Sequence, residues 1–546
     1  METDDTSVPA GFELGLAYPD EDALDAVVAQ LVEDRVASRI SEHDATLWGP
    51  DAEEEAGKRL GWTDLHVTSV PLVAQVEALR DELRGAGLDR VVLCGMGGSS
   101  LAPEVICATA GVPLTVLDSS DPDMVREAIA EGLERTVVVV SSKSGGTVET
   151  DSQRRAYEHA FEVAGIDPAS RIVVVTDPGS PLDEEATGKG YRVFHADPQI
   201  GGRYSALTAF GLVPSGLAGA DVGGLLQQAD DIAEDVAADD ETNPALVLGA
   251  LLGLANKEGV DKLVLADAGS ANVGFGDWAE QLVAESTGKQ GRGILPVVVD
   301  GPDAPNADAS TADEVVGMIG PMSEDHPVAA SGYGFAVDAP LGALFVLWEY
   351  ATAVAGRLIG INPFDQPDVE SAKQAARAML EGSSEAPVAV FTDGGVTVYD
   401  YTGWLPEDAL TVRTAVASLL DELDPEHGYI AVQAYLDRFR QKELADSRDT
   451  LATRTGRPTT FGWGPRFLHS TGQYHKGGPA TGVYLQITGD PDRDLEVPGR
   501  PFTFGEFLLA QAVGDAGVLT DHGRPVLRLH LDGTDAARET LREALA

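Results

Sequence analysis

Short, uninterrupted apolar runs alternate with segments of helical character from about residue 85 onward. Four of these runs are rich in Val, Ile and Leu: DRVVLCG (89–95), PLTVLDS (113–119), RTVVVVSS (135–142) and RIVVVTD (171–177). Strands this apolar are covered on both faces, which is typical of a parallel sheet built from βαβ units. A further strand, YRVFHAD (191–197), would extend the same sheet.

A second block with the same alternation begins near residue 225. The stretch LLQQADDIAEDVAADD is typical of a helix, and KLVLADAGS (262–270) and GILPVVVDG (293–301) are typical of strands. The apolar run LGALFVLWEYATAVAG (341–356) has 16 residues and contains Glu349, whereas a membrane-spanning helix needs about 20 apolar residues. We therefore expect a buried helix here, another helix at the end of 361–380, and a soluble protein.

These patterns predict an α/β protein in four parts. We expect a helical N-terminal segment over 1–60, a first β/α domain over 61–222, and a second β/α domain over 223–385. A C-terminal region of less regular α+β character follows over 386–546. The stretch EGSSEAP (381–387) has the small and polar composition of a linker.

The chain is strongly acidic. Its 546 residues include 38 Lys and Arg against 89 Asp and Glu, a formal net charge of −51. This charge repels nucleic acid and anionic membranes, so we expect neither as a partner. The carboxylates are spread along the chain, which fits an ordinary solvated surface or adaptation to a salty cytoplasm, where salt screens their repulsion. Two cysteines exclude a disulfide framework, and the N-terminus lacks the pattern of a signal peptide, so we expect a cytoplasmic protein.

Two turns rich in glycine and hydroxyl groups follow predicted strands. The first, GMGGSSL (95–101), lacks the third glycine of the dinucleotide fingerprint because Ser100 stands there. The second, SSKSGGT (141–147), places hydroxyls, two glycines and a lysine at one helix N-terminus, where N–H groups can bind an anion. Its spacing differs from that of a P-loop and suits a phosphate monoester better than a nucleoside triphosphate. A nicotinamide-dependent oxidoreductase is disfavoured for the same reasons.

Three further motifs supply groups for acid–base chemistry. GGRYS (201–205) presents Arg203 beside two glycines. In QLVAESTGK (281–289), Gln281 and Glu285 lie four residues apart and share a helix face, and the dipole at a helix C-terminus raises the pKa of a carboxyl group toward that of a usable base. In NPFDQPDVESAK (362–373), Gln366 and Lys373 lie seven residues apart, which is two helical turns if a helix begins near Pro367. No His, Cys, Asp and Glu cluster has metal-ligand spacing, which favours proton transfer without a metal over a metal-assisted hydride shift.

In this order, the five motifs resemble those of the phosphoglucose isomerase family over roughly residues 60–380. The resemblance implies two sugar-isomerase (SIS) domains, each a β/α/β sandwich around a parallel sheet, plus a C-terminal α+β extension. It also implies metal-free interconversion of glucose 6-phosphate and fructose 6-phosphate through a cis-enediol, a step of glycolysis and gluconeogenesis. The family further implies a cytoplasmic homodimer with no cofactor.

The resemblance assigns a role to each matching residue. Glu285 matches the base that moves a proton between C1 and C2, Arg203 the residue that stabilises the cis-enediolate, and Lys373 a residue of the ring-opening step. Gln281 and Gln366 match residues that position the substrate. The positions matching those that hold the substrate phosphate are Ser99, Ser142, Lys143, Ser144 and Thr147.

The ring-opening histidine departs from the family pattern. The family usually places it in a loop between the glutamate and the lysine, but here that interval contains only His326. The segment GPRFLHSTGQYHKGGP (464–479) instead resembles the longer isomerases, including the isomerase half of transaldolase–isomerase fusions. We expect His469 or His475 to complete the site, with His326 as the alternative.

Two other functions remain open. One is a bifunctional phosphoglucose and phosphomannose isomerase on the same fold. The other is a noncatalytic sugar-phosphate sensor, which has no need to keep Glu285, Arg203 and Lys373 together.

Overall fold

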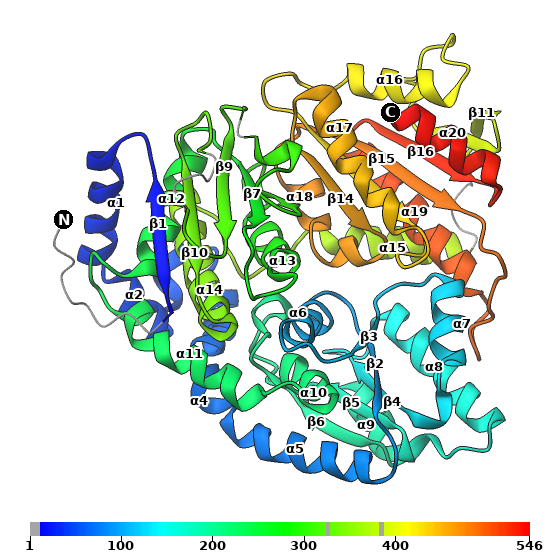
Figure 1. The fold of residues 1–546 in the computed structure, drawn as a ribbon, viewed down its shortest axis with the longest axis horizontal. Coiled ribbons are helices and arrows are strands. Elements are labelled where there is room, and N and C mark those ends of the chain that lie inside the picture. Colours follow the sequence, from blue (N-terminus) through cyan, green and yellow to red (C-terminus); the bar gives the residue numbers. More distant parts are fainter. Residues whose placement is uncertain (1–10, 309, 324–327, 382–386) are drawn as a thin grey trace.

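The computed structural model describes residues 11–308, 310–323, 328–381 and 387–546. His326 and most of the predicted linker, residues 382–386, lie outside these ranges. The described residues form three β-sheets with helices packed on them (Figure 1).

The first sheet is the predicted parallel one. Its strand order is β3-β2-β4-β5-β6, with β2 (Arg90–Cys94), β3 (Thr115–Leu117), β4 (Thr136–Ser141), β5 (Ile172–Thr176) and β6 (Arg192–His195). Successive valines of β4 point to opposite faces. Val139 packs with α5 (Val70–Gly85) and α10 (Ala209–Ala218), while Val140 packs with α8 (Val148–Val163). Both faces are covered, which explains the uninterrupted apolar runs.

Further helices of the first domain are α6 (Leu101–Thr109), α7 (Pro122–Ala130) and α9 (Pro181–Lys189).

The second sheet has the order β1-β10-β9-β7-β8 and is parallel except at its edge. Its strands are β7 (Lys262–Asp267), β8 (Leu295–Val299), β9 (Glu314–Ile319), β10 (Gly334–Asp338) and β1 (Glu13–Ala17). The expectation of a purely helical N-terminal segment was wrong here, because β1 pairs antiparallel with β10 (Figure 1). Leu14 and Leu16 pack against the domain core, as alternate residues of a half-buried strand do. Helices α1 (Glu21–Glu33) and α2 (Val36–Ser41) pack on the same core.

The predicted apolar helix forms the centre of this domain. α14 (Leu341–Ile359) packs against α11 (Val222–Ala237), α12 (Pro244–Lys257) and α13 (Phe275–Thr287). It is the one helix in the described part of the chain with the length and apolarity of a membrane span, and 89% of that span is buried inside the protein. Burial raises the pKa of Glu349, in its middle, well above the ordinary value. A helix buried all round is apolar all round.

The C-terminal region is more regular than its sequence indicates. Six strands lie in the order β11-β12-β16-β15-β13-β14: β11 (Ala389–Asp393), β12 (Val396–Asp400), β13 (Tyr429–Tyr435), β14 (Thr459–Trp463), β15 (Gly482–Gly489) and β16 (Val526–Leu531). The last four are mutually parallel. Gln433, Gln486 and Arg528 stand opposite one another on three of them, all buried. Gln486 donates to Gln433 at 3.1 Å. These polar residues interrupt the apolar runs and hide the strands from a hydrophobicity pattern.

Helices cover both sides of the C-terminal sheet and connect it to the two β/α domains. They are α15 (Val369–Leu380), α16 (Val412–Asp421), α17 (Ser447–Thr455), α18 (Gly472–Gly477), α19 (Phe504–Asp521) and α20 (Asp535–Leu545). α15 packs along α19 and α18 packs against α13. The C-terminal region therefore touches the helix that contains Lys373 and the helix that contains Glu285.

Gly514 sets the distance between α15 and α19. A Cβ at Gly514 would lie 2.8 Å from the backbone nitrogen of Ala376, whereas a Cβ at Gly517, one turn further along α19, would meet nothing within 4 Å. The helices can therefore approach closely only because residue 514 has no side chain.

We expect Gly514→Ala to destabilise the protein by about 1–3 kcal/mol, because a backbone atom cannot move aside as a side chain can. The matched control Gly517→Ala should stabilise it by roughly 0.5–1 kcal/mol through helix propensity. Thermal unfolding of the two variants checks this pair. A Gly514→Ala variant as stable as Gly517→Ala would contradict the close packing.

Candidate active site

The glycine turn after β2 is the point at which three parts of the chain meet. Gly97 has a φ of 53°, and a Cβ there would lie 2.8 Å from Nε2 of Gln281 and 2.9 Å from the carbonyl oxygen of His469. A Cβ at Gly98 would overlap the carbonyl oxygen of Gly202. The first domain, α13 and the C-terminal region can meet here because Gly97 and Gly98 have no side chains.

The second predicted turn connects β4 to α8 as expected. Ser142 Oγ accepts from Gly145 N at 3.2 Å and donates to Thr147 Oγ1 at 3.3 Å. Ser144 Oγ accepts from Gly146 N at 3.2 Å. Thr147 is the N-cap residue of α8, and its side chain makes no capping hydrogen bond. The first N–H groups of α8 thus resemble an anion site at a helix N-terminus.

This turn lines a cavity of about 480 Å³ between the first domain, α15 and the C-terminal region. The cavity is large enough for a sugar phosphate. Four of the predicted site residues line it: Ser144, Thr147, Lys373 and His469. Glu149, which the sequence analysis did not single out, lines it too.

Lys143 points elsewhere. Its ammonium lies 3.1 Å from Asp177 Oδ2 and donates to the carbonyl oxygens of Asp197 and Pro198 at 3.3 and 3.0 Å. Burial lowers its pKa, against the charge of Asp177. The side chain therefore ties the turn to the segment before GGRYS rather than entering the cavity.

Glu285 and Arg203 form a buried pair at the end of α13. Glu285 Oε2 lies 3.6 Å from Arg203 Nη1, and Gln281 Nε2 donates to the same oxygen at 3.4 Å. Burial raises the pKa of Glu285, and the charges of Arg203, His469 and Lys373 and the hydrogen bond from Gln281 limit the rise. A raised pKa makes this carboxylate a stronger base than an exposed glutamate.

Arg203 is 2% exposed, and four of the five N–H groups of its guanidinium donate hydrogen bonds within the protein. Nε donates to Ser286 Oγ at 2.8 Å, Nη1 to Gln366 Oε1 at 3.1 Å, and Nη2 to the carbonyl oxygens of Pro363 and Asp365 at 2.6 and 2.9 Å. Arg203 therefore fixes the end of α13 and the segment 362–366 in one arrangement. Gln366 reaches the site through this contact.

His469 comes from the short helix Arg466–His469 of the C-terminal region. Its Nε2 lies 3.1 Å from Glu149 Oε1, and Gln511 Nε2 on α19 donates to the same oxygen at 2.7 Å. Burial would raise the pKa of Glu149, but the hydrogen bond and charge of His469 and the charge of Lys373 hold it below the ordinary value. Arg466 anchors this helix to the first domain through ion pairs with Glu104 and with Asp118, the latter at 2.7 Å.

Glu149 and Gln511 were missed by sequence reasoning. Glu149 follows the phosphate-type turn directly, and this proximity was the available signal. Gln511 carried no signal, because it lies 362 residues from Glu149 along the chain.

His475 lies in a different environment. It stacks on Tyr429, whose hydroxyl lies 3.0 Å from His475 Nδ1, and Tyr484 donates to its carbonyl oxygen at 3.0 Å. Burial, with the charges of Lys476 and Arg524, lowers its pKa well below the ordinary value. The structure thus brings His469, and not His475, next to the other candidate residues. Ser99 lies in the turn before α6, half-buried.

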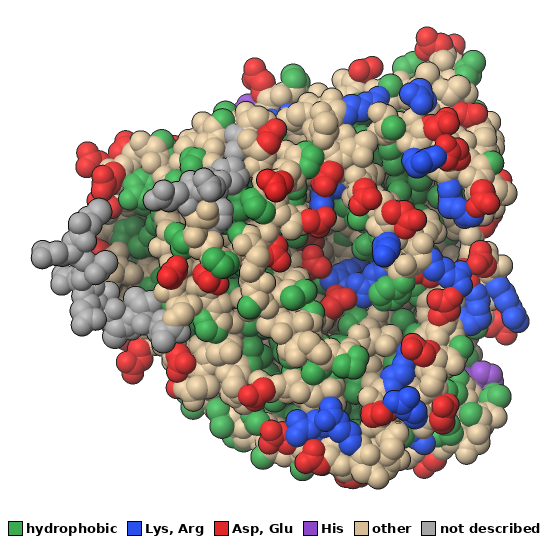
Figure 2. All heavy atoms as spheres, in the orientation of Figure 1, with side chains coloured by type: hydrophobic (Ala, Val, Ile, Leu, Met, Phe, Trp, Pro, Cys, Tyr) green, Lys and Arg blue, Asp and Glu red, His purple; other side chains and the backbone are tan. Residues whose placement is uncertain are grey.

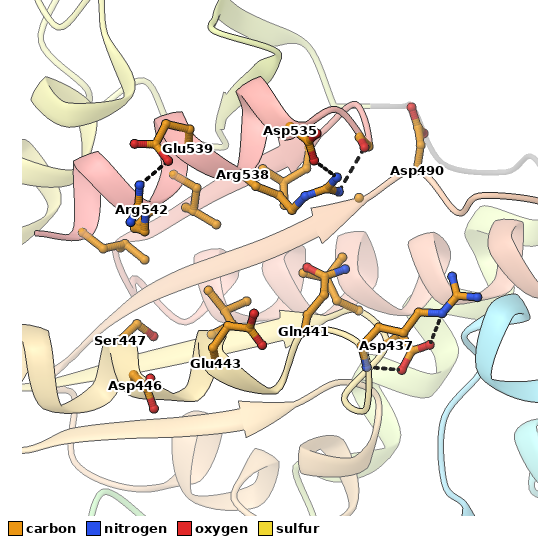
Figure 3. A pocket seen from close by; sticks show the side chains of 18 of the residues that line it. Asp437, Gln441, Glu443, Asp446, Ser447, Asp490, Asp535, Arg538, Glu539 and Arg542 are labelled. Carbon is orange, nitrogen blue, oxygen red and sulfur yellow. Dashed lines mark hydrogen bonds and ion pairs between the residues drawn. The ribbon is translucent and has the colours of Figure 1, made fainter.

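A second cavity lies apart from these residues. About 870 Å³ lie between α20 and the segment 437–447, beyond the carboxyl ends of β13 and β15 (Figure 3). Carboxylates dominate its lining, and its arginines pair with them, as Arg538 does with Asp535 at 2.5 Å. None of the candidate residues lines it. Within the described ranges, no group of three or more His, Cys, Asp or Glu side chains is placed to hold a metal ion.

Comparison with known proteins identifies the family of this chain. A sequence model of the family described as phosphoglucose isomerase matches residues 80–292. A probable glucose-6-phosphate isomerase of Haloarcula marismortui is 30% identical over 356 residues, covering 56% of this chain and 82% of the relative. The chain belongs to the phosphoglucose isomerase family. A glucose-6-phosphate isomerase of Citrifermentans bemidjiense is 30% identical over 383 residues, covering 57% of this chain and 71% of the relative.

Solved structures confirm the predicted α/β fold of the phosphoglucose isomerase family. A hypothetical protein from Thermus thermophilus superposes with a TM-score of 0.58 at 25% identity, covering 67% of this chain and all of the other. A glucose-6-phosphate isomerase from Chlamydia trachomatis superposes with a TM-score of 0.53 at 21% identity, covering 69% and 90%. The second likeness concerns the fold alone.

Lys143→Met tests whether this lysine holds the turn in place rather than binding phosphate. Because its ammonium bonds to Asp177 and two carbonyl groups, we expect a lower melting temperature and a change of less than about threefold in affinity for inorganic phosphate. Thr147→Val, a change of similar size in the turn itself, should weaken phosphate binding by roughly tenfold through the loss of one hydrogen bond to a charged group. Isothermal calorimetry with inorganic phosphate measures both. A tenfold loss in Lys143→Met would return Lys143 to the phosphate site.

Proposed function

We propose that this chain is a glucose-6-phosphate isomerase, acting in glycolysis and gluconeogenesis, that interconverts glucose 6-phosphate and fructose 6-phosphate by proton transfer through a cis-enediol. The observation that carries the proposal is the buried Glu285, 3.6 Å from the buried guanidinium of Arg203. The relatives that bear this name support it. Cytoplasmic location and a homodimer remain expectations from the family.

Glu285 is proposed to move the proton between C1 and C2. One carboxylate that reaches both carbons suffices for an aldose–ketose isomerisation. The charge that develops on the enediolate oxygens needs a cation that is already oriented, because reorientation during the reaction would add to the barrier. Arg203 meets this condition, since its four hydrogen bonds of 2.6 to 3.1 Å hold it in place.

The phosphate group is proposed to bind at the turn 142–147 and the start of α8, with Ser99 on the neighbouring turn. A phosphate does not react in this isomerisation, so its binding energy can serve to position the sugar carbons. Gln281 and Gln366 lie beside Glu285 and Arg203 and are proposed to bind the sugar hydroxyls.

Ring opening is proposed to use His469, assisted by Glu149 and Lys373. The Glu149 carboxylate lies 3.1 Å from Nε2 and orients the imidazole, so that its other nitrogen can exchange a proton with the ring oxygen. Lys373 lines the same cavity, and its charge acts on both Glu149 and Glu285. His475, packed among tyrosines, takes no part.

A coupled assay tests the reaction. The purified protein receives fructose 6-phosphate and EDTA, and glucose-6-phosphate dehydrogenase reports the product as NADPH. Glu285→Gln should lower kcat by about 10²–10⁴-fold, the usual contribution of a general base, and still bind 6-phosphogluconate. Glu349→Gln is the matched control, because Glu349 is also a buried carboxyl on a helix but its pKa responds to burial and not to the charges of the site, and it should keep the wild-type kcat. Full turnover in Glu285→Gln would remove Glu285 as the base, and NADPH from mannose 6-phosphate alone would favour the bifunctional enzyme.

His469→Ala and His475→Ala separate the two histidines. We expect His469→Ala to lower kcat by roughly 10²-fold, because it removes a proton donor at the sugar ring. His475→Ala should lower the melting temperature through the lost packing on Tyr429 and leave kcat within about threefold. The same coupled assay and thermal unfolding measure both. The reverse pattern would place the ring-opening group at His475.

A further inference from the structure

Lys289 is a buried lysine just beyond the C-terminal end of α13, four residues after Glu285. Its side chain is 1% exposed. Nζ donates to the carbonyl oxygens of Asn362 and Asp365 at 2.7 and 2.6 Å and to Asp365 Oδ1 at 2.7 Å. An ammonium group has three donors, so these three acceptors use all of them.

The carbonyl oxygen of Asp365 is shared. It accepts from Lys289 at 2.6 Å and from Arg203 Nη2 at 2.9 Å. Two buried cations thus hold the segment 362–366 from one side, and that segment in turn orients Arg203 through the carbonyl of Pro363 and the side chain of Gln366. A change at Lys289 would be transmitted to Arg203 without any direct contact with the substrate.

We propose that Lys289 is a positioning residue of the isomerase site: its ammonium fixes the segment 362–366, and that segment fixes the guanidinium of Arg203 opposite Glu285. The proposal rests on the function proposed above, because it assigns Lys289 to the orientation of the cation that faces the enediolate.

Electrostatics gives this arrangement a distinctive pH dependence. Burial and the charge of Arg203 lower the pKa of Lys289 to about 8, while Asp365 and Glu285 oppose the shift. These three are the charged groups that face Lys289 from the 201–205 turn, the segment 362–366 and α13. A lysine is charged below its pKa, so the third hydrogen bond is lost as the pH rises through about 8. Arginine at this position would stay charged throughout.

Lys262 provides a matched control. It is also 1% exposed, in the same domain, and pairs with Asp261 at 2.5 Å and Asp313 at 3.0 Å. Neither of these two partners of Lys262 belongs to the candidate active site. Replacing either lysine by Met removes a buried charge from its partners, so both variants should lose stability. Only the Lys289 variant should lose activity per folded molecule.

The experiment measures kcat, KM and their pH profiles for wild type, Lys289→Met, Lys289→Arg and Lys262→Met. We expect Lys289→Met to lower kcat by about 100-fold with KM within about threefold, because misplacement of a catalytic group by about 1 Å has this effect. Wild type should lose kcat as the pH rises through about 8, and Lys289→Arg should move this limb to higher pH. Lys262→Met should keep the wild-type kcat and profile.

Several outcomes would overturn the proposal. One is a wild-type kcat that stays constant from pH 7 to 9.5, and another is an alkaline limb that persists unchanged in both Lys289 variants. A third is a common loss of kcat in Lys289→Met and Lys262→Met. If Lys289→Arg does not fold, Lys289→Met answers the same question, because its alkaline limb must vanish.

A readout without turnover distinguishes this proposal from the proposed function. Calorimetry with 6-phosphogluconate, whose carboxylate presents negative charge at C1, should show about tenfold weaker binding to Lys289→Met, the loss of one well-placed charged hydrogen bond. Binding of inorganic phosphate should be unchanged. If wild type does not isomerise the sugar but this difference appears, the positioning role stands and the proposed reaction fails. Equal 6-phosphogluconate affinity in wild type and Lys289→Met would overturn the positioning role itself.

Discussion

A buried guanidinium must have its N–H groups satisfied, and the architecture around Arg203 follows from this requirement. In a chain of net charge −51, a cation removed from water needs uncharged acceptors as well as carboxylates. Arg203 finds them in a hydroxyl at the end of α13 and in two backbone carbonyls of the segment 362–366. The first domain, which contains Arg203, and the second, which contains the acceptors, must therefore meet at one place. The carboxylates visible in Figure 2 are instead spread over the surface.

The C-terminal region takes part in the site as well as in the fold. His469 reaches the cavity because Arg466 pairs with Glu104 and Asp118 of the first domain, and because Gly97 leaves room for the backbone of His469. Gln511 approaches from α19 and orients Glu149. The site therefore depends on contacts between residues that lie more than 300 positions apart in the sequence. Most of these contacts are polar.

The sequence predicted those features that local pattern determines. Apolar runs located the strands of the first sheet and the strands β7 and β8 of the second. The five motifs located Glu285, Arg203, Gln366 and the phosphate-type turn. It failed where tertiary contacts decide. The strand at Glu13–Ala17 is short and half-buried. The strands with Gln433 and Gln486 contain buried polar residues whose partners, such as Asp515 for Gln486, come from distant parts of the chain. Lys143 looked like a phosphate ligand because the position of Asp177 is not visible in the sequence. Likewise, His469 and His475 are equivalent in a linear pattern, and only their surroundings separate them.

The carboxyl group of Glu349 couples folding of the second domain to proton uptake. Its pKa is raised well above the ordinary value in the folded protein, whereas in the unfolded chain it ionises near its ordinary value of 4.5. Above that value, each folding event takes up a proton at this residue. Such a group weakens the folded state by about 1.4 kcal/mol for each pH unit between the two pKa values. Its contribution to stability is therefore greatest in acid and declines toward neutral pH, opposite to that of the ion-paired carboxylates on the surface. Glu349, in the middle of α14, is thus a titratable group inside an apolar core, and it can exchange its proton with solvent only when the domain opens.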